Sequence, residues 1–294
     1  MRLASVFPPM PTPFRDGEVD ASAIRFNVER WMRAGLGGIV ALGTNGESAL
    51  LDDDESDLVL SATRDVVPRD RVVIAGTGRE STRATIARSK RAAALGADAV
   101  LVRTPSFFKS LCTQSLLVRH YSAVADESPI PVLLYNFPAS TGVAFTPDTV
   151  AHLAEHKNIV GMKESGTDSA AFAAFADAAP STFSMLAGTG TVFYSDLCLG
   201  AVGAILAVAA VEPELCLRLM AVVKAGQHEE GRRLQALMSP LARMVTSGYG
   251  VPGLKAALDI AGYKGGDPRA PLAPVAPEVR EQIRAELARV SEVV

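Results

Sequence analysis

A lysine stands at the end of a short apolar segment of this 294-residue chain. Lys163 follows Asn158-Ile-Val-Gly-Met162, which has the composition of a buried strand, so its amine is expected to enter a cavity at the strand end. Burial disfavours an ammonium ion, so a lysine in such a place readily gives up its proton. The neutral amine can attack a ketone and form an imine that accepts the electron pair of a breaking carbon–carbon bond. The alternative is a lysine whose charged end merely reaches solvent.

A tyrosine ends another apolar segment. Tyr135 closes the segment 132–135 and is followed by Asn136-Phe137-Pro138, in which the proline stiffens the next loop. A phenol close to a developing alkoxide can carry protons. The alternative is a half-buried tyrosine whose hydroxyl only bonds to a backbone group.

A glycine-rich loop follows a third apolar segment. It reads Gly43-Thr44-Asn45-Gly46-Glu47. Glycines let the backbone approach a ligand, and successive N–H groups with the Thr44 hydroxyl can hold a carboxylate. A plain tight turn is the alternative.

No metal site is expected. His152 and His156 stand four residues apart but lack the H-E-x-x-H order and fall on a helix that should face solvent. The cysteines Cys112, Cys198 and Cys216 lack the close spacing of zinc ligands, so we expect buried, reduced thiols.

The composition is that of a globular protein with a sizeable core. Hydrophobic residues make up 48% and charged residues 21%, and the net charge is -3 with both signs interleaved. The charge argues against nucleic acid as a partner. The longest apolar run, 201–211, is too short to span a membrane, and prolines interrupt the N-terminus where a signal peptide needs an apolar stretch. These features predict a cytoplasmic enzyme with no membrane partner.

Short β-branched runs alternate with amphipathic stretches along the chain. The expected strands are Ser5–Phe7, Gly38–Leu42, Val72–Ala75, Ala99–Val102, Val132–Tyr135, Ile159–Lys163, Phe183–Leu186 and Gly203–Ala207. The expected helices include Asp20–Ala34, Asp53–Val66, Ser81–Leu95, Thr113–Ala125, Pro147–Glu155, Pro213–Ala225, His228–Val245, Pro252–Ala261 and Pro277–Val293. Arg83, Arg88 and Arg91 are expected to form a solvated helix face.

Eight nearly all-apolar strands, most followed by a helix, predict an α/β fold, a (β/α)8 TIM barrel. We assign residues 1–210 to the barrel and 211–294 to C-terminal helices that complete and extend it. A doubly wound open sheet is the alternative, but it needs a glycine-rich dinucleotide turn, and Gly76-Thr-Gly78 lacks the third glycine. In a barrel the strand ends meet, which would bring Lys163, Tyr135 and Thr44 together.

The same segments resemble a known family in order, spacing and position. They are Pro9-x-Pro11-Thr12-Pro13-Phe14, Gly43-Thr44-Asn45-Gly46-Glu47, Ala75-Gly76-Thr77-Gly78, Gly96-Ala97-Asp98, Pro129-Ile-Pro131, Tyr135-Asn136-Phe137-Pro138 and Gly161-Met162-Lys163-Glu164-Ser165. Over nearly its whole length the chain resembles the dihydrodipicolinate synthase / N-acetylneuraminate lyase family of pyruvate-dependent class I aldolases.

The resemblance implies roles for particular residues. Lys163 would be the Schiff-base lysine, Tyr135 the proton carrier, and Thr44 the threonine that orients the tyrosine and holds the pyruvate carboxylate. Gly43 belongs to the same carboxylate-holding loop, and Gly188 and Ile205 match positions that line the pyruvate pocket. The resemblance also implies a homotetramer built from dimers, with pyruvate as a small-molecule substrate and no metal or organic cofactor.

Two departures bear on the substrate. Synthases of the lysine pathway have a Thr-Pro-Tyr-Tyr segment whose second tyrosine enters the neighbouring subunit's proton relay, and an arginine two residues past Tyr-x-x-Pro. Here Phe107 and Ser140 stand in those places. Phenylalanine cannot pass a proton, and serine offers no guanidinium.

Other segments are more similar to the 4-hydroxy-2-oxoglutarate aldolases of the family. They are Asn158-Ile-Val-Gly-Met-Lys163, Pro138-Ala-Ser-Thr-Gly142, Gly250-Val-Pro-Gly-Leu-Lys255, Gly262-Tyr-x-Gly-Gly266 and Arg269-Ala-Pro-Leu272. Asn45 and Ser165 also match polar positions of that group and could hold the substrate's far end.

The expected activity is cleavage of a 2-keto-4-hydroxy acid, such as 4-hydroxy-2-oxoglutarate, to pyruvate and a small aldehyde. Condensation of pyruvate with aspartate semialdehyde is the alternative, as is a sugar-acid lyase. A catalytically silent keto-acid binder is the alternative from another class of protein, and the intact Lys163, Tyr135 and Thr44 set argues against it.

Overall fold

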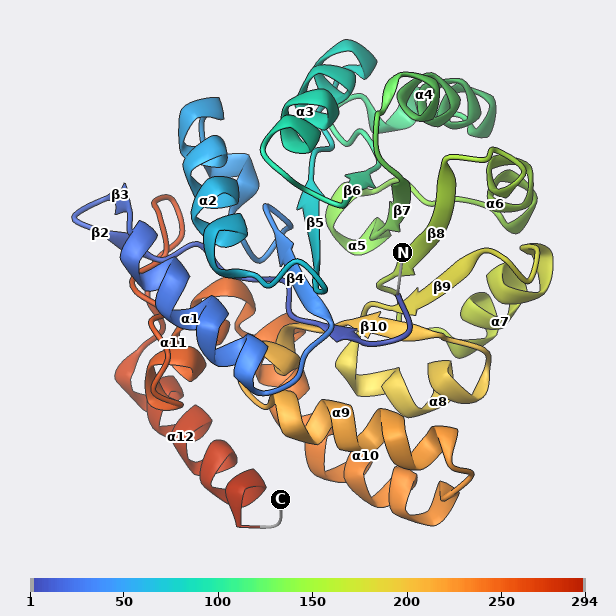
Figure 1. Cartoon of the computed structure of the whole chain (residues 1–294). Coiled ribbons are helices and arrows are strands. Elements are labelled where there is room, and N and C mark those ends of the chain that lie inside the picture. The colour runs from blue at the N-terminus through green and yellow to red at the C-terminus, as the bar shows by residue number, and fades with distance from the viewer. Residues whose placement is uncertain (1–2, 293–294) are drawn as a thin grey trace.

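The computed structural model describes residues 3–292, and eight parallel strands form its centre (Figure 1). The strands are β1 (Val6–Phe7), β4 (Gly38–Ala41), β5 (Val72–Gly76), β6 (Ala99–Arg103), β7 (Val132–Asn136), β8 (Ile159–Glu164), β9 (Ser184–Ala187) and β10 (Gly203–Ile205). Their order in the sheet is β1-β10-β9-β8-β7-β6-β5-β4. Backbone hydrogen bonds from Val40 to Pro8 and from Met10 to Val40 close the sheet between its two outer strands. The predicted TIM barrel is therefore confirmed.

Helices surround the barrel (Figure 1). Those that follow the first seven barrel strands are α1 (Ala21–Arg33), α2 (Asp53–Val66), α3 (Thr82–Ala94), α4 (Gln114–Glu127), α5 (Pro138–Thr141), α6 (Pro147–Ala154), α7 (Ser169–Ala178) and α8 (Phe193–Cys198). Short 3-10 turns are η1 (Ser48–Leu50), η2 (Lys109–Leu111), η3 (Gly190–Val192) and η4 (Ala207–Ala210). Side chains of Asp20, Asp52, Ser81, Thr113 and Asp168 cap helix N-termini as their residue types predict.

The strands are apolar because both of their faces are covered. Alternate residues such as Phe7, Ile74 and Leu133 fill the barrel interior, while their neighbours, such as Val73 and Leu134, pack against the surrounding helices. No helix within residues 3–292 is long and apolar enough to cross a membrane.

Four long helices follow the last strand. They are α9 (Pro213–Lys224), α10 (His228–Arg243), α11 (Gly250–Ile260) and α12 (Pro277–Ser291), with a single π-helical turn, η5 (Met244–Gly248), between α10 and α11. α9 packs against α10 and α11 packs against α12. α9 and α10 lie below β10 in the view of Figure 1. The division at residue 210 stays a prediction. Val293, the predicted end of the last helix, lies outside the described residues.

Trp31 ties α1 to the C-terminal segment. Its side chain is fully buried, its indole N–H donates to the Ala210 carbonyl at 2.8 Å, and its ring stacks on Tyr263 at 5.5 Å. We expect Trp31→Ala to lower the free energy of unfolding by about 3–5 kcal/mol, because it empties a large buried volume. Urea denaturation followed by circular dichroism measures this. Phe26→Ala, on the exposed side of the same helix, is the control; an equal loss in both variants would contradict the prediction.

Three details differ from the sequence analysis. An antiparallel hairpin, β2 (Phe14–Arg15) with β3 (Glu18–Val19), precedes α1. Helices α5, α7 and α8 also fall outside the predicted set; α7 is rich in alanine, which carries little amphipathic pattern. Cys198 is exposed, while Cys216 is buried as expected.

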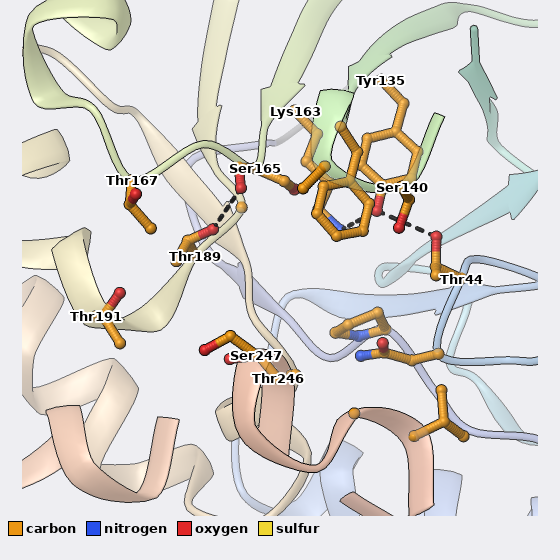
Figure 2. A pocket seen from close by; sticks show the side chains of 18 residues that line it. Thr44, Tyr135, Ser140, Lys163, Ser165, Thr167, Thr189, Thr191, Thr246 and Ser247 are labelled. Atoms are coloured by element: carbon orange, nitrogen blue, oxygen red, sulfur yellow. Dashed lines mark hydrogen bonds between the residues drawn. The ribbon is translucent and has the colours of Figure 1, made fainter. Parts of the chain in front are cut away.

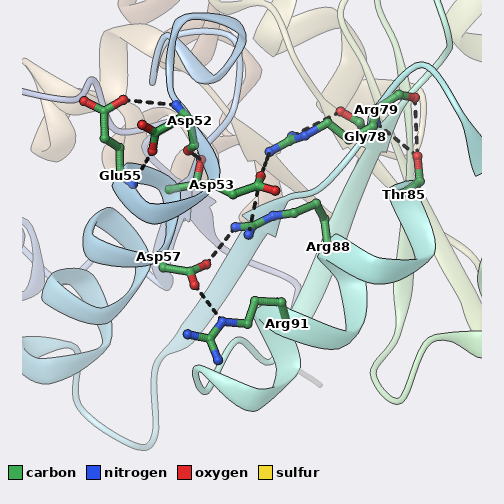
Figure 3. A network of polar contacts seen from close by, with 10 residues as sticks. Asp52, Asp53, Glu55, Asp57, Gly78, Arg79, Thr85, Arg88 and Arg91 are labelled. Atoms are coloured by element: carbon green, nitrogen blue, oxygen red, sulfur yellow. Dashed lines mark hydrogen bonds and ion pairs between the residues drawn. The ribbon is translucent and has the colours of Figure 1, made fainter. Parts of the chain in front are cut away.

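The prediction that Arg88 belongs to a solvated helix face is wrong. It is 7% exposed and lies 2.9 Å from Asp57 and 3.6 Å from Asp53, which join α3 to α2 (Figure 3). Arg91 is exposed and also pairs with Asp57, at 2.6 Å. The acidic partners lie in a different helix, so periodicity within α3 alone could not reveal the pairing.

Candidate active site

A cavity of about 430 Å³ opens at the carboxyl ends of the barrel strands. It is lined by Pro9, Thr44, Asn45, Tyr135, Phe137, Ala139, Ser140, Lys163, Ser165, Thr167, Gly188, Thr189, Thr191, Ala207, Thr246, Ser247, Gly250 and Val251. Its size and position are those of a small-molecule site in a TIM barrel.

Lys163 and Tyr135 face each other in this cavity (Figure 2). They occupy paired positions on adjacent parallel strands, β8 and β7, so both side chains point the same way. The Lys163 Nζ lies 3.4 Å from the Tyr135 hydroxyl oxygen and 4.4 Å from the centre of its ring. Lys163 is 6% and Tyr135 is 5% exposed. An amine and a phenol are thus held in contact in a largely desolvated place.

Thr44 continues this contact. Its hydroxyl lies 3.2 Å from that of Tyr135, so amine, phenol and hydroxyl form one chain (Figure 2). The loop around Thr44 is two consecutive tight turns, in which the N–H of Gly46 and of Glu47 donate to the carbonyls of Gly43 and Thr44. Because those two N–H groups are used inside the loop, a bound carboxylate would depend on Thr44 and Asn45.

The predicted substrate-binding residues divide into two sets. Asn45, Ser165 and Gly188 line the cavity. Gly43 instead borders a much smaller neighbouring void, and Ile205 is fully buried in the barrel interior. Ile205 is the last residue of β10, and Ala207, two residues further along the chain, lines the cavity instead.

Gly188 shows why a glycine is needed at the end of β9. A Cβ at this position would lie 2.3 Å from the Ser165 hydroxyl oxygen and 2.4 Å from the Glu164 carbonyl oxygen. The N–H of Gly188 donates to that same carbonyl. The close approach fixes the loop after β8, which carries Ser165, against β9.

Sequence reasoning missed a group of hydroxyls on the far side of the cavity from Tyr135 (Figure 2). They belong to Thr167, Thr189, Thr191, Thr246 and Ser247. The first three follow β8 and β9, so their place after barrel strands was an available signal. Thr246 and Ser247 belong to the π-helical turn η5, and π-turns are frequent at functional sites. No strand-end pattern marks that segment.

Two carboxylates are buried behind the site. Glu164, next to Lys163, accepts hydrogen bonds from the Asn136 side-chain amide and the Gly166 N–H, and burial raises its pKa. Asp196 in α8 is 2% exposed. Burial and then the charge of Glu164 raise the pKa of Asp196 from 3.8 to about 7.

This raised pKa has a consequence for stability. Between about pH 4 and pH 7 the folded protein keeps a proton on Asp196 that the unfolded chain has lost, so the free energy of unfolding falls as the pH rises through this window. Asp196→Asn removes the penalty. We expect the variant to exceed wild type by about 2–4 kcal/mol near pH 8 and by much less near pH 4.

Urea denaturation across this pH range checks the prediction. Asp177→Asn, at an exposed position in α7, serves as the control and should follow wild type. If Asp196→Asn were less stable than wild type near pH 8, the buried carboxylate would be stabilising and the prediction wrong.

Within residues 3–292 there is no group of three or more His, Cys, Asp or Glu side chains that could hold a metal ion. The side chains that line the cavity include an amine, a phenol, an amide and several hydroxyls.

A closed β/α barrel with a buried lysine amine and a phenol in contact at its strand ends has the architecture of a class I aldolase, a carbon–carbon lyase. The model of the dihydrodipicolinate synthetase family matches residues 2–290. The chain belongs to this family of pyruvate-dependent aldolases and lyases, as its motifs predict.

Three known proteins illustrate the similarity. A 4-hydroxy-tetrahydrodipicolinate synthase of an Exiguobacterium species is 34% identical, with 96% of each chain covered. The "Probable 4-hydroxy-2-oxoglutarate aldolase, mitochondrial" of Emericella nidulans is 37% identical over 95% of this chain and 91% of that protein. The crystal structure of a chloride-inhibited dihydrodipicolinate synthase from Acinetobacter baumannii, complexed with pyruvate, has a TM-score of 0.92, with 32% identity and 99% of each chain covered.

Proposed function

We propose that this enzyme cleaves a 2-keto-4-hydroxy acid, such as 4-hydroxy-2-oxoglutarate, to pyruvate and a small aldehyde. The observation that carries the proposal is the chain of contacts from the Lys163 amine through the Tyr135 hydroxyl to the Thr44 hydroxyl, with distances of 3.4 and 3.2 Å. An amine and a phenol in contact could act as nucleophile and proton carrier on one substrate carbon chain, which supports the proposal.

The reaction begins with attack of the neutral Lys163 amine on the C2 carbonyl. Tyr135 then gives its proton to the oxygen that leaves as water, so that a protonated imine and a Tyr135 phenolate form. Tyr135 takes the proton of the C4 hydroxyl while the C3–C4 bond breaks. The electron pair moves through C3 to the imine nitrogen, and the aldehyde leaves. Protonation of the resulting enamine at C3, followed by hydrolysis of the imine, releases pyruvate and the free lysine. Thr44 holds Tyr135 and the C1 carboxylate.

The far end of the substrate would meet polar, uncharged groups. Asn45 and Ser165 line the cavity and could hold the distal carboxylate of 4-hydroxy-2-oxoglutarate. Their match to the aldolase group in the family and the similar Emericella protein support this substrate.

A sugar-acid lyase is the second candidate, and a specific observation favours it. Among the cavity residues, all of which fall within the described range 3–292, Lys163 is the only cationic side chain. The five hydroxyls opposite Tyr135 suit a neutral, hydroxylated chain at least as well as a second carboxylate. Ser140, which also lines the cavity, stands where the synthases of the family carry an arginine, and this argues against the synthase reaction.

A coupled assay that detects free pyruvate separates these reactions. We expect pyruvate from 4-hydroxy-2-oxoglutarate. Pyruvate only from a 2-keto-3-deoxy sugar acid would establish the second candidate. Consumption of pyruvate with aspartate semialdehyde, without cleavage of either acid, would establish the synthase reaction and overturn the proposal.

We also propose a cytoplasmic homotetramer. Phe107, Phe108 and Leu111 form an apolar patch and are 78%, 66% and 65% exposed. Clustered exposed aromatic side chains are typical of a subunit interface. We expect sedimentation analysis to give four times the chain mass, and Phe108→Glu with Leu111→Glu to give a smaller species. A tetramer that survives both changes would exclude this patch as an interface.

A further inference from the structure

A second lysine is buried just outside the cavity. Lys255 in α11 is 1% exposed, and its Nζ lies 2.5 Å from the Glu47 Oε1, whose side chain is also 1% exposed. The Nζ further donates to the Asp267 carbonyl at 2.9 Å and lies 4.4 Å from the centre of the Phe14 ring. The pair is thus enclosed on several sides.

Glu47 is the last residue of the Thr44 loop. It has a left-handed backbone conformation, with φ 54°, and its N–H closes a tight turn on the Thr44 carbonyl. The second carboxylate oxygen of Glu47 accepts the N–H of Arg269 at 2.8 Å. The loop that presents Thr44 to Tyr135 is therefore fastened at its end to a segment more than 200 residues away in the chain.

The same helix that supplies Lys255 also borders the cavity. Gly250 and Val251, the first residues of α11, are among the lining residues. The helix α11 therefore forms part of the cavity wall and also holds the end of the Thr44 loop.

A gain in stability does not by itself explain why the Glu47–Lys255 ion pair is buried. Removing two charges from water is costly, and replacing a buried ion pair by apolar side chains of similar volume is often neutral or stabilising. Burial lowers the pKa of Lys255. The Glu47 carboxylate acts in the opposite direction and favours the charged lysine. The ion pair does provide a short contact that fixes the distance between the Thr44 loop and α11.

We propose that Glu47 and Lys255 are positioning residues that hold the loop so that the Thr44 hydroxyl stays on the Tyr135 hydroxyl. They touch neither substrate nor reacting atoms and act through Thr44. The proposal rests on the proposed function, because it assigns the loop a part in the proton transfer of the lysine imine.

Exchange of the pyruvate methyl protons in D2O tests this without a second substrate. Lys163 forms the imine with pyruvate, Tyr135 removes a C3 proton to give the enamine, and a deuteron from solvent returns to C3. Nuclear magnetic resonance can follow this exchange for days, so slow variants still give a rate.

We expect Lys255→Met to slow the exchange about 10- to 100-fold, the range expected when a contact in the site shifts by about 1 Å. In a Thr44→Val background the same change should slow it less than about 2-fold, because the hydroxyl it positions is gone. Glu47→Gln, which keeps the shape of the side chain, should behave like Lys255→Met.

Arg64→Met is the matched control. It breaks another partly buried ion pair, in which Arg64 lies 3.1 Å from Asp98. Asp98 directly precedes β6, so this pair lies at the end of the barrel opposite to the cavity. It should leave the exchange rate near that of wild type. Circular dichroism of every variant shows whether it is folded, and if Lys255→Met does not fold, Glu47→Gln gives the answer.

The outcomes separate the two claims. Wild type without exchange would overturn the proposed function and this inference with it. Wild type that exchanges, with Lys255→Met and Glu47→Gln equally fast, would overturn the inference alone. An equal slowing with and without the Thr44 hydroxyl would also overturn it, because the pair would then not act through Thr44.

Discussion

Replacing Lys163 with alanine is expected to abolish both the covalent capture of pyruvate and the cleavage of the keto acid. The amine lies 3.4 Å from the Tyr135 hydroxyl and is the only cationic group among the cavity residues, all of which lie within residues 3–292. Without it no imine forms, and the electron pair of the breaking bond has no acceptor. We expect a loss in kcat of at least about 10⁴-fold, the size usual for removal of a nucleophile.

Mass spectrometry after addition of pyruvate and borohydride measures the first part. In wild type a reduced adduct should map to Lys163, and in Lys163→Ala it should vanish. Lys157→Ala, six residues earlier and exposed, should keep both adduct and turnover. An adduct on another lysine, with turnover unchanged in Lys163→Ala, would refute the assignment and leave a silent keto-acid binder as the better description.

Replacing Tyr135 with phenylalanine is expected to separate imine formation from bond cleavage. The ring still fills its place on β7 and still packs on Phe137, at 5.9 Å, so the cavity should keep its shape. The variant lacks the hydroxyl that lies between the Lys163 amine and the Thr44 hydroxyl. Loss of a positioned proton carrier lowers the rate by about 10²- to 10⁴-fold.

The two steps are measured on the same protein. The borohydride adduct on Lys163 should still form at high pyruvate concentration, while cleavage, followed by pyruvate release, should fall. Tyr194→Phe is the control, because the Tyr194 hydroxyl contacts His228, at 3.3 Å, and Tyr194 is not among the cavity residues. Cleavage in Tyr135→Phe within about twofold of wild type would mean that another group carries the proton.

The barrel could be predicted because each strand is covered on both faces. Such strands must be apolar throughout, and the eight predicted segments agree with the observed strands to within one or two residues. The hairpin 14–19 has strands of only two residues, and α7 is nearly all alanine and phenylalanine. Neither carries enough periodicity to be recognised.

The catalytic candidates could be predicted for a related reason. Lys163 and Tyr135 lie at the ends of apolar strands and Thr44 follows one, and the parallel strands of a barrel bring their carboxyl ends to one place. The prediction for Ile205 is more detailed, because it specifies which residue of a strand faces the cavity. That depends on where β10 ends, and β10 is only three residues long.

The sequence by itself determined the barrel, the family and the residues that meet at its strand ends, because local hydrophobic patterns and short motifs carry that information. Only the tertiary structure decided what surrounds them. Thr246 and Ser247 reach the cavity from a π-helical turn after the barrel, and Lys255, on a helix that looks ordinary in sequence, becomes one of the most buried side chains. Contacts between segments 200 residues apart depend on how whole helices pack, and no local pattern records that packing.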